Sequence, residues 1–556
     1  MARMLTVPGR VVGRVILAAA AVGLTITATG PASATQMVPD PETLVAQDLA
    51  REVITTQTQD PTALEVASDG RVIFAERKGR VKIWKQDGTL VEAGRIGVDS
   101  QANQCDDCPG RNLDEGGLHG LLLAQDFDDT GHLYLYYSVP NSLDEAPVPA
   151  KQPKARGPQA TEGKFRLSRF TLVGDTLDLD SELNVFENPA EWFYCCHYGG
   201  DMEWLPDGTL LLSVGDDTYS HESSGYSPRD YRPGKEYNNA DLTAQNLADR
   251  RGKLLRIDVA DVDGDGSLLP ADNPFAGTPG ADPYVYAYGF RSNYRFDVNT
   301  QTGTAYVGTV GPDGKYPDPN RGPAAHEELE VVPPGGGTNH GWPRCIADNI
   351  PYNDYNWETG QAGGPLSCDG MTPAAIYYSY QPSPTTSPWL QLGSGGTCSA
   401  IMGGSVYDRP ASAALSLPER FDDHLLWMEW CRGAVISTPI NADGTLDTDV
   451  EDVKVIFTGL SSPIDSAVGP DGALYIAEYA ARNYNSNASR ISRITCAGCT
   501  PDSADYGGAP VASHRAEPSL GGVDLPAGEP PRATGAVLLG VALAVLTAAR
   551  RRRGVI

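Results

Sequence analysis

One short pattern recurs along this chain: a turn that contains Gly, often as Asp-Gly, is followed or preceded by a strand-length run of alternating apolar residues. Asp-Gly readily adopts the positive φ angles of tight hairpin turns, and a period of two is typical of half-buried β-strands. Such units, repeated at long intervals, are typical of blades around an axis. We therefore expect an all-β fold, a six-bladed β-propeller with long rim loops; seven or eight blades stay open, because a blade can lack the motif. The units cover residues 67–84, 128–138, 205–216, 300–311, 421–438 and 469–479.

Long insertions separate these units. Residues 141–163 are rich in Pro, Lys and Ala, residues 218–247 are polar, and residues 345–400 are bounded by cysteines. Loops of such length in a compact domain usually have a function or lack a fixed structure. We expect them to be rim loops of one propeller domain that spans residues 35–499.

The first 34 residues have the features of a secretory signal peptide. Basic residues precede the apolar run VILAAAAVGLTITA, and Ala32-Ser33-Ala34 is a small-residue cleavage site. We expect residues 1–34 to be removed and the mature chain to be secreted. An uncleaved N-terminal anchor is the alternative.

The C-terminal end has a second targeting pattern. Residues 500–535 form a Gly/Pro/Ala-rich linker that contains LPAGE, and residues 536–556 combine a short apolar run with Arg550–Arg553. This order resembles the cell-wall sorting signals of Gram-positive bacteria, although LPAGE departs from their LPxTG sequence. We expect the protein to be retained at the cell surface, in the wall or the membrane, through this segment.

The charge of the chain limits its partners. The formal net charge is −28, and the body between the arginine-rich ends is more negative still. Such a surface repels nucleic acids and anionic membranes, so neither is an expected partner. It suits a small neutral ligand and leaves carboxylates available for calcium. We expect a monomer.

Ten cysteines fall into couples of near neighbours along the sequence. An even number in an exported chain predicts disulfides. The two CxxC couples are also compatible with zinc, but no further Cys or His stands at a matching spacing. The couples are Cys105/Cys108, Cys195/Cys196, Cys345/Cys368, Cys398/Cys431 and Cys496/Cys499.

The adjacent cysteines Cys195 and Cys196 directly precede His197. A disulfide between them would stiffen the turn that presents His197, whereas separate pairing would fasten a loop. A redox role is a third interpretation, because a disulfide between neighbours is strained and easily reduced.

The segment DVDGDGSLLPAD, residues 261–272, alternates acidic residues with Gly. Asp261, Asp263 and Asp265 resemble part of a calcium loop. The glutamate that closes an EF-hand loop is absent, so a solvated acidic turn is an equal alternative.

A set of motifs in fixed order resembles the soluble glucose/sorbosone dehydrogenases over about residues 60–495. The resemblance implies a six-bladed propeller that uses pyrroloquinoline quinone (PQQ) and calcium to oxidise aldoses. The motifs are EGGLHGLLLAQDF (115–127), CCHYGGDMEWLPDGTLLLSVGDD (195–217), ADRRGKLLRIDV (248–259), YAYGFRSNYRF (286–296), HEELEVVPPGGGTNHGWP (326–343) and SSPIDSAVGPDGALYIAEY (461–479).

The resemblance assigns catalytic roles to two residues. His197 stands where the family has its general base, and an imidazole can take the hydroxyl proton of the anomeric carbon as hydride leaves for the quinone. Glu115 stands at a polar position near the substrate and is expected to orient the sugar or His197.

The resemblance also assigns cofactor and metal contacts. Arg291 matches an arginine that contacts the quinone, and Ser292 replaces the asparagine that follows it in the family. Gly311 and Pro312 match a Gly-Pro pair whose carbonyl oxygens bind the active-site calcium, a metal that prefers oxygen ligands.

Three family cations are missing at the matching positions. Cys431 stands where the family has a lysine, and Ser462 and Ile464 stand where it has a pair of arginines. A tricarboxylate quinone calls for such cations. Arg432, next to Cys431, is the replacement that we expect to contact the cofactor; the remaining candidates are Arg291, Arg295 and Arg344.

Three further features have a structural and a functional interpretation. His119 is expected to be a packed core histidine rather than a site residue. Asp216-Asp217 would serve equally as ligands or as strand caps. The aromatic loop PYNDYNW, residues 351–357, is expected to be a surface loop, with stacking on sugar rings as the alternative.

The sequence therefore favours an exported quinoprotein that oxidises aldoses at the anomeric carbon and passes electrons to an external acceptor. The competing hypothesis is a non-catalytic propeller that binds carbohydrate or a wall component; a third is a calcium-stabilised adhesion scaffold. Retention of His197, Glu115 and Arg291 favours the enzyme, and loss of the three cations favours the binders.

Overall fold

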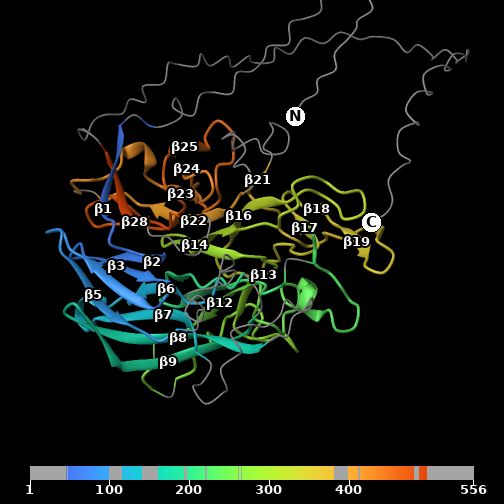
Figure 1. Ribbon diagram of the computed structural model, residues 1–556, viewed down its shortest axis with the longest axis horizontal. Helices are drawn as coiled ribbons and strands as arrows, with labels where there is room; N and C mark the ends of the chain where they lie inside the picture. The colour runs from blue at the N-terminus through green and yellow to red at the C-terminus, as the bar shows by residue number, and fades with distance from the viewer. Residues whose placement is uncertain are drawn as a thin grey trace, which may run out of the picture. The chain divides into compact units, whose positions relative to one another are not determined.

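The computed structural model describes most of the predicted propeller domain (Figure 1). The described residues are 46, 48–98, 115–140, 161–192, 197–219, 222–260, 262–264, 266–380, 398–410, 413–480 and 488–496.

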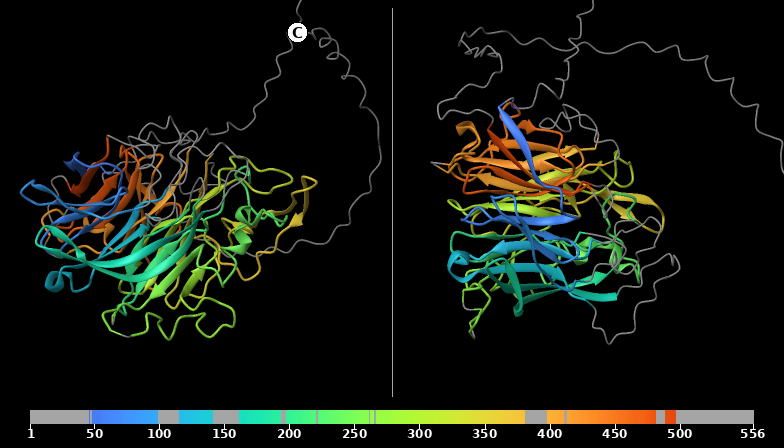
Figure 2. Two further views of the ribbon diagram at one scale, coloured as in Figure 1. Left: turned by 60° about the horizontal axis from the view of Figure 1, so that its bottom comes forward. Right: turned by 60° about the vertical axis from the view of Figure 1, so that its left-hand side comes forward.

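Six four-stranded antiparallel sheets form the body of the structure. Their innermost strands contact one another in a closed ring, each touching the inner strand of the sheet before and after it. Figure 1 and Figure 2 show the sheets arranged around a common centre like blades. The prediction of an all-β six-bladed propeller is confirmed.

The strands of each blade run in order from the innermost to the outermost. Blade 1 contains β2 (Pro61–Val66), β3 (Val72–Glu76), β4 (Arg80–Trp84) and β5 (Leu90–Arg95). Blade 2 contains β6 (Leu118–Leu123), β7 (His132–Ser138), β8 (Thr161–Val173) and β9 (Thr176–Trp192), with the one-turn helix α1 (Phe127–Thr130). Blade 3 contains β10 (Met202–Trp204), β11 (Leu210–Val214), β12 (Lys253–Ile257) and β13 (Val285–Tyr288). Blade 4 contains β14 (Asn293–Asn299), β15 (Thr304–Thr309), β16 (His326–Val332) and β21 (Ile376–Ser379). Blade 5 contains β22 (Ile401–Tyr407), β23 (His424–Glu429), β24 (Ala434–Pro439) and β25 (Lys454–Phe457), with the 3₁₀ helix η5 (Glu419–Phe421). Blade 6 contains β26 (Pro463–Val468), β27 (Leu474–Glu478), β28 (Arg490–Cys496) and β1 (Leu49–Thr55).

The turns inside the blades contain the Asp-Gly pairs that the sequence repeats. Gly208 has φ +86° and Gly472 has φ +80°, a region that other residues adopt only with strain. The preceding aspartates fasten these turns, because Asp207 Oδ1 accepts the N–H of Thr209 at 2.9 Å. The repeated motif therefore marks real hairpins.

The ring is closed by the two ends of the described chain. Strand β1 pairs antiparallel with β28, with Leu49 opposite Cys496. Ion pairs reinforce the junction: Arg51 lies 2.5 Å from Glu478, and Arg493 lies 2.8 Å from Glu52. The last blade is thus built from both ends of the described part of the chain, which the sequence pattern did not predict.

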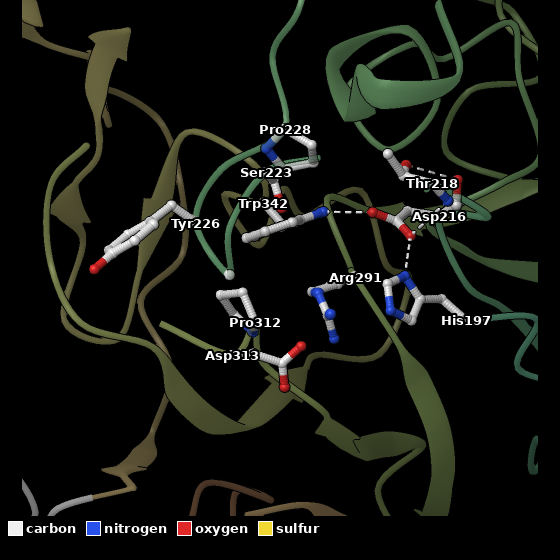
Figure 3. A pocket seen from close by; sticks show the side chains of 11 residues that line it. His197, Asp216, Thr218, Ser223, Tyr226, Pro228, Arg291, Pro312, Asp313 and Trp342 are labelled. Carbon is white, nitrogen blue, oxygen red and sulfur yellow. Dashed lines mark hydrogen bonds and ion pairs between the residues drawn. The ribbon is translucent and has the colours of Figure 1, made fainter. Parts of the chain in front are cut away.

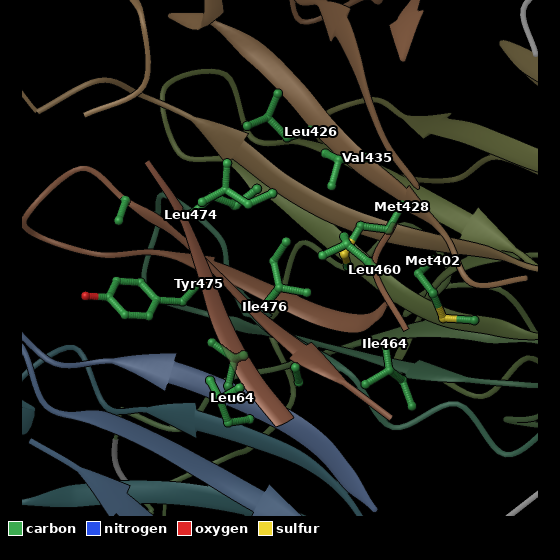
Figure 4. Packing of buried hydrophobic residues seen from close by; sticks show 14 of the residues in the cluster. Leu64, Met402, Leu426, Met428, Val435, Leu460, Ile464, Leu474, Tyr475 and Ile476 are labelled. Atoms are coloured by element: carbon green, nitrogen blue, oxygen red, sulfur yellow. The ribbon is translucent and has the colours of Figure 1, made fainter. Parts of the chain in front are cut away.

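Apolar side chains fill the spaces between neighbouring blades. Figure 4 shows the cluster that joins blades 5, 6 and 1, where Leu426 and Val435 pack with Leu474, Ile476 and Leu64. Burying each aliphatic side chain of this size contributes roughly 1.5–3 kcal/mol relative to exposure. Further clusters fill the other joints between blades, so the core is a set of interblade layers.

Carboxylates and one arginine come together on the inner strands. Arg295 of β14 is almost fully buried, 3.2 Å from Asp465 and 3.5 Å from Asp201. Burial raises the pKa of Asp297 and of Asp465 to about 7, and it raises the pKa of Glu203 well above its usual value. This group is short of positive charge, since a single arginine faces several acids.

The predicted rim loop 345–400 is partly regular structure. Residues Ile376–Ser379 form β21, the outer strand of blade 4, so the interpretation of the whole segment as a loop was wrong. The segment also contains two small hairpins and is fastened by the disulfide Cys345–Cys368. The hairpins are β17 (Cys345–Ile346) with β18 (Ile350–Pro351) and β19 (Asn353–Asn356) with β20 (Gln361–Pro365).

The other insertion that the structure describes, 218–247 except for residues 220 and 221, carries the 3₁₀ helices η3 (Glu236–Asn238) and η4 (Ala240–Leu242).

A second disulfide joins Cys398 to Cys431, and Cys496 is also disulfide-bonded. No described helix is long and apolar enough to cross a membrane. Several predictions fall on residues outside the described ranges: segments 1–34, 500–535 and 536–556, Cys105, Cys108, Cys195, Cys196, Cys499, Asp261 and Asp265.

Candidate functional site

A pocket lies where loops from blades 3 and 4 meet the inserted segment 222–228. It contains about 230 Å³ of empty space, part of it open to solvent. Figure 3 shows the side chains around it. The lining residues are His197, Asp216, Thr218, Ser223, Gly225, Tyr226, Pro228, Arg291, Pro312, Asp313 and Trp342.

His197 enters this pocket from the turn before β10. Its φ angle is +71°, which is uncommon for a residue with a side chain. Two neighbours hold the turn: the His197 N–H donates to Glu115 Oε2 at 2.7 Å, and Gly215 lies against the His197 carbonyl. A Cβ at Gly215 would lie 1.9 Å from that oxygen, so only glycine fits there.

The imidazole of His197 is fixed by a buried carboxylate. Nδ1 of His197 lies 2.7 Å from Oδ1 of Asp216, whose Oδ2 accepts the indole N–H of Trp342 at 2.7 Å. The N–H of Thr218 also donates to Asp216 Oδ1 at 3.1 Å. A carboxylate acceptor at Nδ1 places the ring proton of neutral His197 there, so Nε2 is left as an acceptor.

Arg291 comes from the connection between β13 and β14. Its Nη1 donates to the carbonyl of Val310 at 2.9 Å, and its guanidinium lies 5.8 Å from the centre of a Trp342 ring. Among the described residues it has no carboxylate partner within ion-pair distance, and its exposed fraction is 6%. In Figure 3 it lies between His197 and Asp313.

Gly311 and Pro312 follow β15; Pro312 and the adjacent Asp313 line the same pocket, whereas Gly311 is not among the lining residues. The Gly311 N–H donates to Glu327 Oε2 at 3.2 Å, and Asp313 Oδ1 accepts the hydroxyl of Tyr380 at 2.9 Å. Within the described residues, the carbonyl oxygens of Gly311 and Pro312 accept no backbone hydrogen bond. Two such carbonyls beside a carboxylate are chemically suited to calcium.

The other arginines considered for the cofactor are bound elsewhere. Arg432 does not line the pocket, and it pairs with Glu429, three residues before it, at 2.8 Å. Arg344 pairs with Asp241 at 2.8 Å, and Arg295 is held by the inner-strand acids.

The three departures from the family motif also leave no cation in the pocket. Cys431 is joined to Cys398, and Ile464 is 4% exposed within the core between blades. Ser462, through its carbonyl, accepts the backbone N–H of Tyr479. Among the described lining residues, Arg291 is therefore the single arginine or lysine. This set does not fit a tricarboxylate quinone.

Besides Gly311, two further predicted site residues are absent from the lining of the pocket. Glu115 supports the backbone of His197 through its carboxylate. Ser292 is buried, and its carbonyl accepts the N–H of Val310 at 2.9 Å.

The predicted calcium loop is described only in part. Asp263 forms an ion pair with Arg169 at 2.5 Å, which commits its carboxylate. No group of three or more His, Cys, Asp or Glu in the described part of the chain could hold a metal ion.

His119 is a packed core residue, as expected. Its Nδ1 lies 2.9 Å from the carbonyl of Gly199, and its ring packs against Phe165. Burial lowers the pKa of His119 to about 4, so the ring is neutral near pH 7.

Several pocket residues were not identified from the sequence. Trp342 lies in the NHGWP stretch, a part of the family-like motifs that gives the tryptophan no role of its own. Asp313 follows the Gly311-Pro312 pair directly, and that adjacency was the available signal. Tyr226 lies in an insertion with no local pattern that points to the pocket.

The structure is a β-propeller with a histidine–carboxylate pair in a pocket formed by the loops of blades 3 and 4 and the inserted segment. Comparisons with known proteins identify its family. The model of the family described as "Glucose / Sorbosone dehydrogenase" matches residues 58–391. The chain belongs to this glucose/sorbosone dehydrogenase family.

Two curated relatives show how far the sequence similarity extends. An uncharacterised protein of Synechocystis is 28% identical over 293 residues, 51% of this chain and 57% of the relative. The HIPL1 protein of Arabidopsis thaliana is 22% identical over 322 residues, 53% of this chain and 40% of the relative. The chain thus spans about half the length of the curated relatives it matches.

Solved structures share the fold at low identity. A putative oxidoreductase (glucose dehydrogenase) of Thermus thermophilus is 21% identical, with a TM-score of 0.50 over 80% of this chain and 99% of that one. The soluble aldose sugar dehydrogenase of Escherichia coli is 19% identical, with a TM-score of 0.52 over 81% and 99%.

Proposed function

We propose that the pocket binds a sugar and that His197 takes a proton from a sugar hydroxyl during oxidation at the anomeric carbon. The observation that carries this proposal is the hydrogen-bonded series from Trp342 through Asp216 to His197. It fixes the tautomer that accepts a proton at Nε2. It also places a negative charge where the resulting imidazolium needs one.

Calcium and the quinone differ in how well the pocket suits them. The carbonyls of Gly311 and Pro312, with Asp313, would hold calcium, and the ion would supply positive charge beside the bound sugar. For the tricarboxylate quinone the described cations do not suffice, so no step is assigned to it. Oxidation of an aldose to its lactone releases two electrons and two protons. His197 accounts for one proton, and an external acceptor is required for the electrons.

The test is turnover with a panel of aldoses. The full chain is supplied with calcium, with or without added PQQ, and reduction of an external dye is followed. We expect sugar-dependent dye reduction that His197→Gln abolishes. The control is His132→Gln, which changes a histidine at the start of β7 that lines no part of the pocket. Turnover that survives His197→Gln would remove the assignment of the base.

A second candidate is a non-catalytic propeller that binds carbohydrate or a wall component. Cys431 and Ile464 stand where the family has cations, but the first is in a disulfide and the second is in the core. The pocket is therefore left with one arginine among the described residues, which favours this candidate. Saturable sugar binding with no dye reduction under any cofactor condition would favour this candidate over the enzyme.

We also propose that the protein is exported and kept at the cell surface. The signal-like residues 1–34, the segment 536–556 and the disulfides of the propeller support this location. Fractionation of producing cells tests it: protein found in the cytosol with reduced cysteines would contradict it.

A further inference from the structure

We infer that the pocket prefers a sugar that carries one carboxylate, a uronic acid, over a neutral aldose, and that Arg291 binds this carboxylate. The inference rests on the proposed function in one respect, since the same pocket receives the sugar. It concerns what is bound and is independent of whether the sugar is oxidised.

The first support is the state of Arg291. Its side chain is largely buried, and its one hydrogen bond to the protein within the described residues is to the Val310 carbonyl. A guanidinium has five N–H donors. None of its nitrogens is a buried atom without a partner, so the remaining donors reach the open space of the pocket. A largely buried cation that has no carboxylate partner interacts favourably with an anionic ligand group.

The second support is that the neighbouring carboxylates are already engaged. Asp216 accepts hydrogen bonds from His197, Trp342 and the backbone of Thr218. Asp313 accepts the hydroxyl of Tyr380. Neither forms an ion pair with the guanidinium, so its charge stays available to a ligand.

The third support is orientation. The Trp342 ring lies 5.8 Å from the guanidinium carbon of Arg291, and the Val310 carbonyl holds Nη1. One hydrogen bond and one neighbouring ring restrict the guanidinium before any ligand arrives. A planar arginine fork that is already oriented suits the two oxygens of a carboxylate.

The fourth support is the balance of charge. Without a bound cation, the described lining holds one arginine beside Asp216 and Asp313, so it can pair with one ligand carboxylate, whereas second and third carboxylates would meet these acids. The same acids can accept hydrogen bonds from sugar hydroxyls. The lining therefore suits a sugar with one carboxylate better than a tricarboxylate quinone.

Calorimetric titration of the full chain tests the preference. The ligands are D-glucuronate, its methyl ester, D-glucose and glucose 6-phosphate, all at one ionic strength. We expect glucuronate to bind about tenfold or more tightly than glucose, with the methyl ester resembling glucose. Equal affinity for glucuronate and glucose would overturn the inference, and so would tighter binding of the phosphate. Saturable PQQ binding that glucuronate displaces would overturn it as well.

Matched variants locate the preference. Arg291→Gln should bind glucuronate and glucose with similar affinity, whereas Arg344→Gln, which changes an arginine paired with Asp241, should keep the full preference. If Arg291→Gln fails to fold, as judged by its melting temperature, Arg291→Lys serves instead: it keeps the charge without the fork and should retain part of the preference. A folded Arg291 variant with an undiminished preference would contradict the inference.

The readouts keep the two proposals apart. Binding preference is measured by heat without turnover, and oxidation is measured by dye reduction. No dye reduction with a clear glucuronate preference would end the oxidoreductase proposal alone. Dye reduction with equal affinities would end the uronate proposal alone.

Discussion

Asp216 and His197 are joined by a 2.7 Å hydrogen bond between Oδ1 and Nδ1, and the carboxylate is fully buried while it makes this contact. In the sequence the two residues flank a hairpin: His197 precedes β10, and Asp216 follows β11. The contact is therefore built by the short inner hairpin of blade 3, and any change in this hairpin alters the direction of the imidazole.

Replacing Asp216 with Asn should change the tautomer of His197. An amide that turns its NH₂ toward Nδ1 needs an acceptor there, so the ring proton moves to Nε2. Nitrogen NMR of His197 should show protonation at Nδ1 in the native protein and at Nε2 in Asp216→Asn. Sugar turnover should fall about 10²–10⁴-fold. Asp272→Asn, at an exposed aspartate paired with Arg256, is the control and should change neither readout.

Trp342→Phe should weaken both sides of the pocket. It removes the N–H that satisfies Asp216 Oδ2 and alters the ring that lies near Arg291. Leaving a buried carboxylate oxygen unsatisfied costs about 1–3 kcal/mol, so the melting temperature should fall. The matched control is Trp357→Phe, which loses an indole hydrogen bond to the carbonyl of Arg229 outside the pocket. Equal loss of sugar affinity in both variants would show that the effect is not specific to the pocket.

The acids on the inner strands should make stability depend on pH. Asp297 and Asp465 have folded pKa values of about 7, above the value near 4 expected when unfolded. The folded state therefore binds more protons between these values, and stability falls as pH rises from about 4 to about 7.

Glu203→Gln isolates one member of this group. Burial and the neighbouring acids raise the pKa of Glu203 well above its usual value. The variant should melt above the native protein at pH 8 and close to it at pH 4, where Glu203 is neutral in the folded state. Glu92→Gln, at a largely exposed side chain, should show no such pH-dependent gain. A gain of the same size at both pH values would contradict the electrostatic explanation.

Loss of the disulfide Cys345–Cys368 should destabilise the inserted segment beside the pocket. The bridge closes a loop of 23 residues, which corresponds to about 3 kcal/mol in the chain-entropy model. The double variant Cys345→Ser/Cys368→Ser should therefore melt at a lower temperature. Its sugar affinity should also fall, because Trp342 lies three residues before the bridge. An unchanged melting temperature under oxidising conditions would contradict this prediction.

The blades could be predicted from the sequence because their signals are local. An Asp-Gly turn and a period of two lie within one hairpin, as at Asp207-Gly208, and need no information from elsewhere. Strand β1 and strand β21 lack that turn, and each is defined by a partner strand far away in the sequence. Their sequences alone do not specify that pairing.

The site could likewise be predicted only where its residues stand in local sequence motifs. His197, Arg291 and the Gly311-Pro312 pair stand in recognisable motifs, and His197, Arg291 and Pro312 line the pocket. The partners of these residues come from other loops, so the sequence left the role of Asp216 open and did not point to Trp342. Arg432 looked available in the sequence, but Glu429 is close enough along the chain to neutralise it.

The pairing of β1 with β28 has a consequence for folding during synthesis of the chain. The partners Arg51 and Ser492 are separated by 441 residues, so the first strand that the structure describes cannot pair until the last one is synthesised. Until the chain has emerged as far as β28, blade 6 is incomplete and the inner ring cannot close. Contacts of such long range slow folding and leave sheet edges open meanwhile. A ribosome stalled before β28 would therefore hold an open chain of blades that proteases and chaperones can still reach.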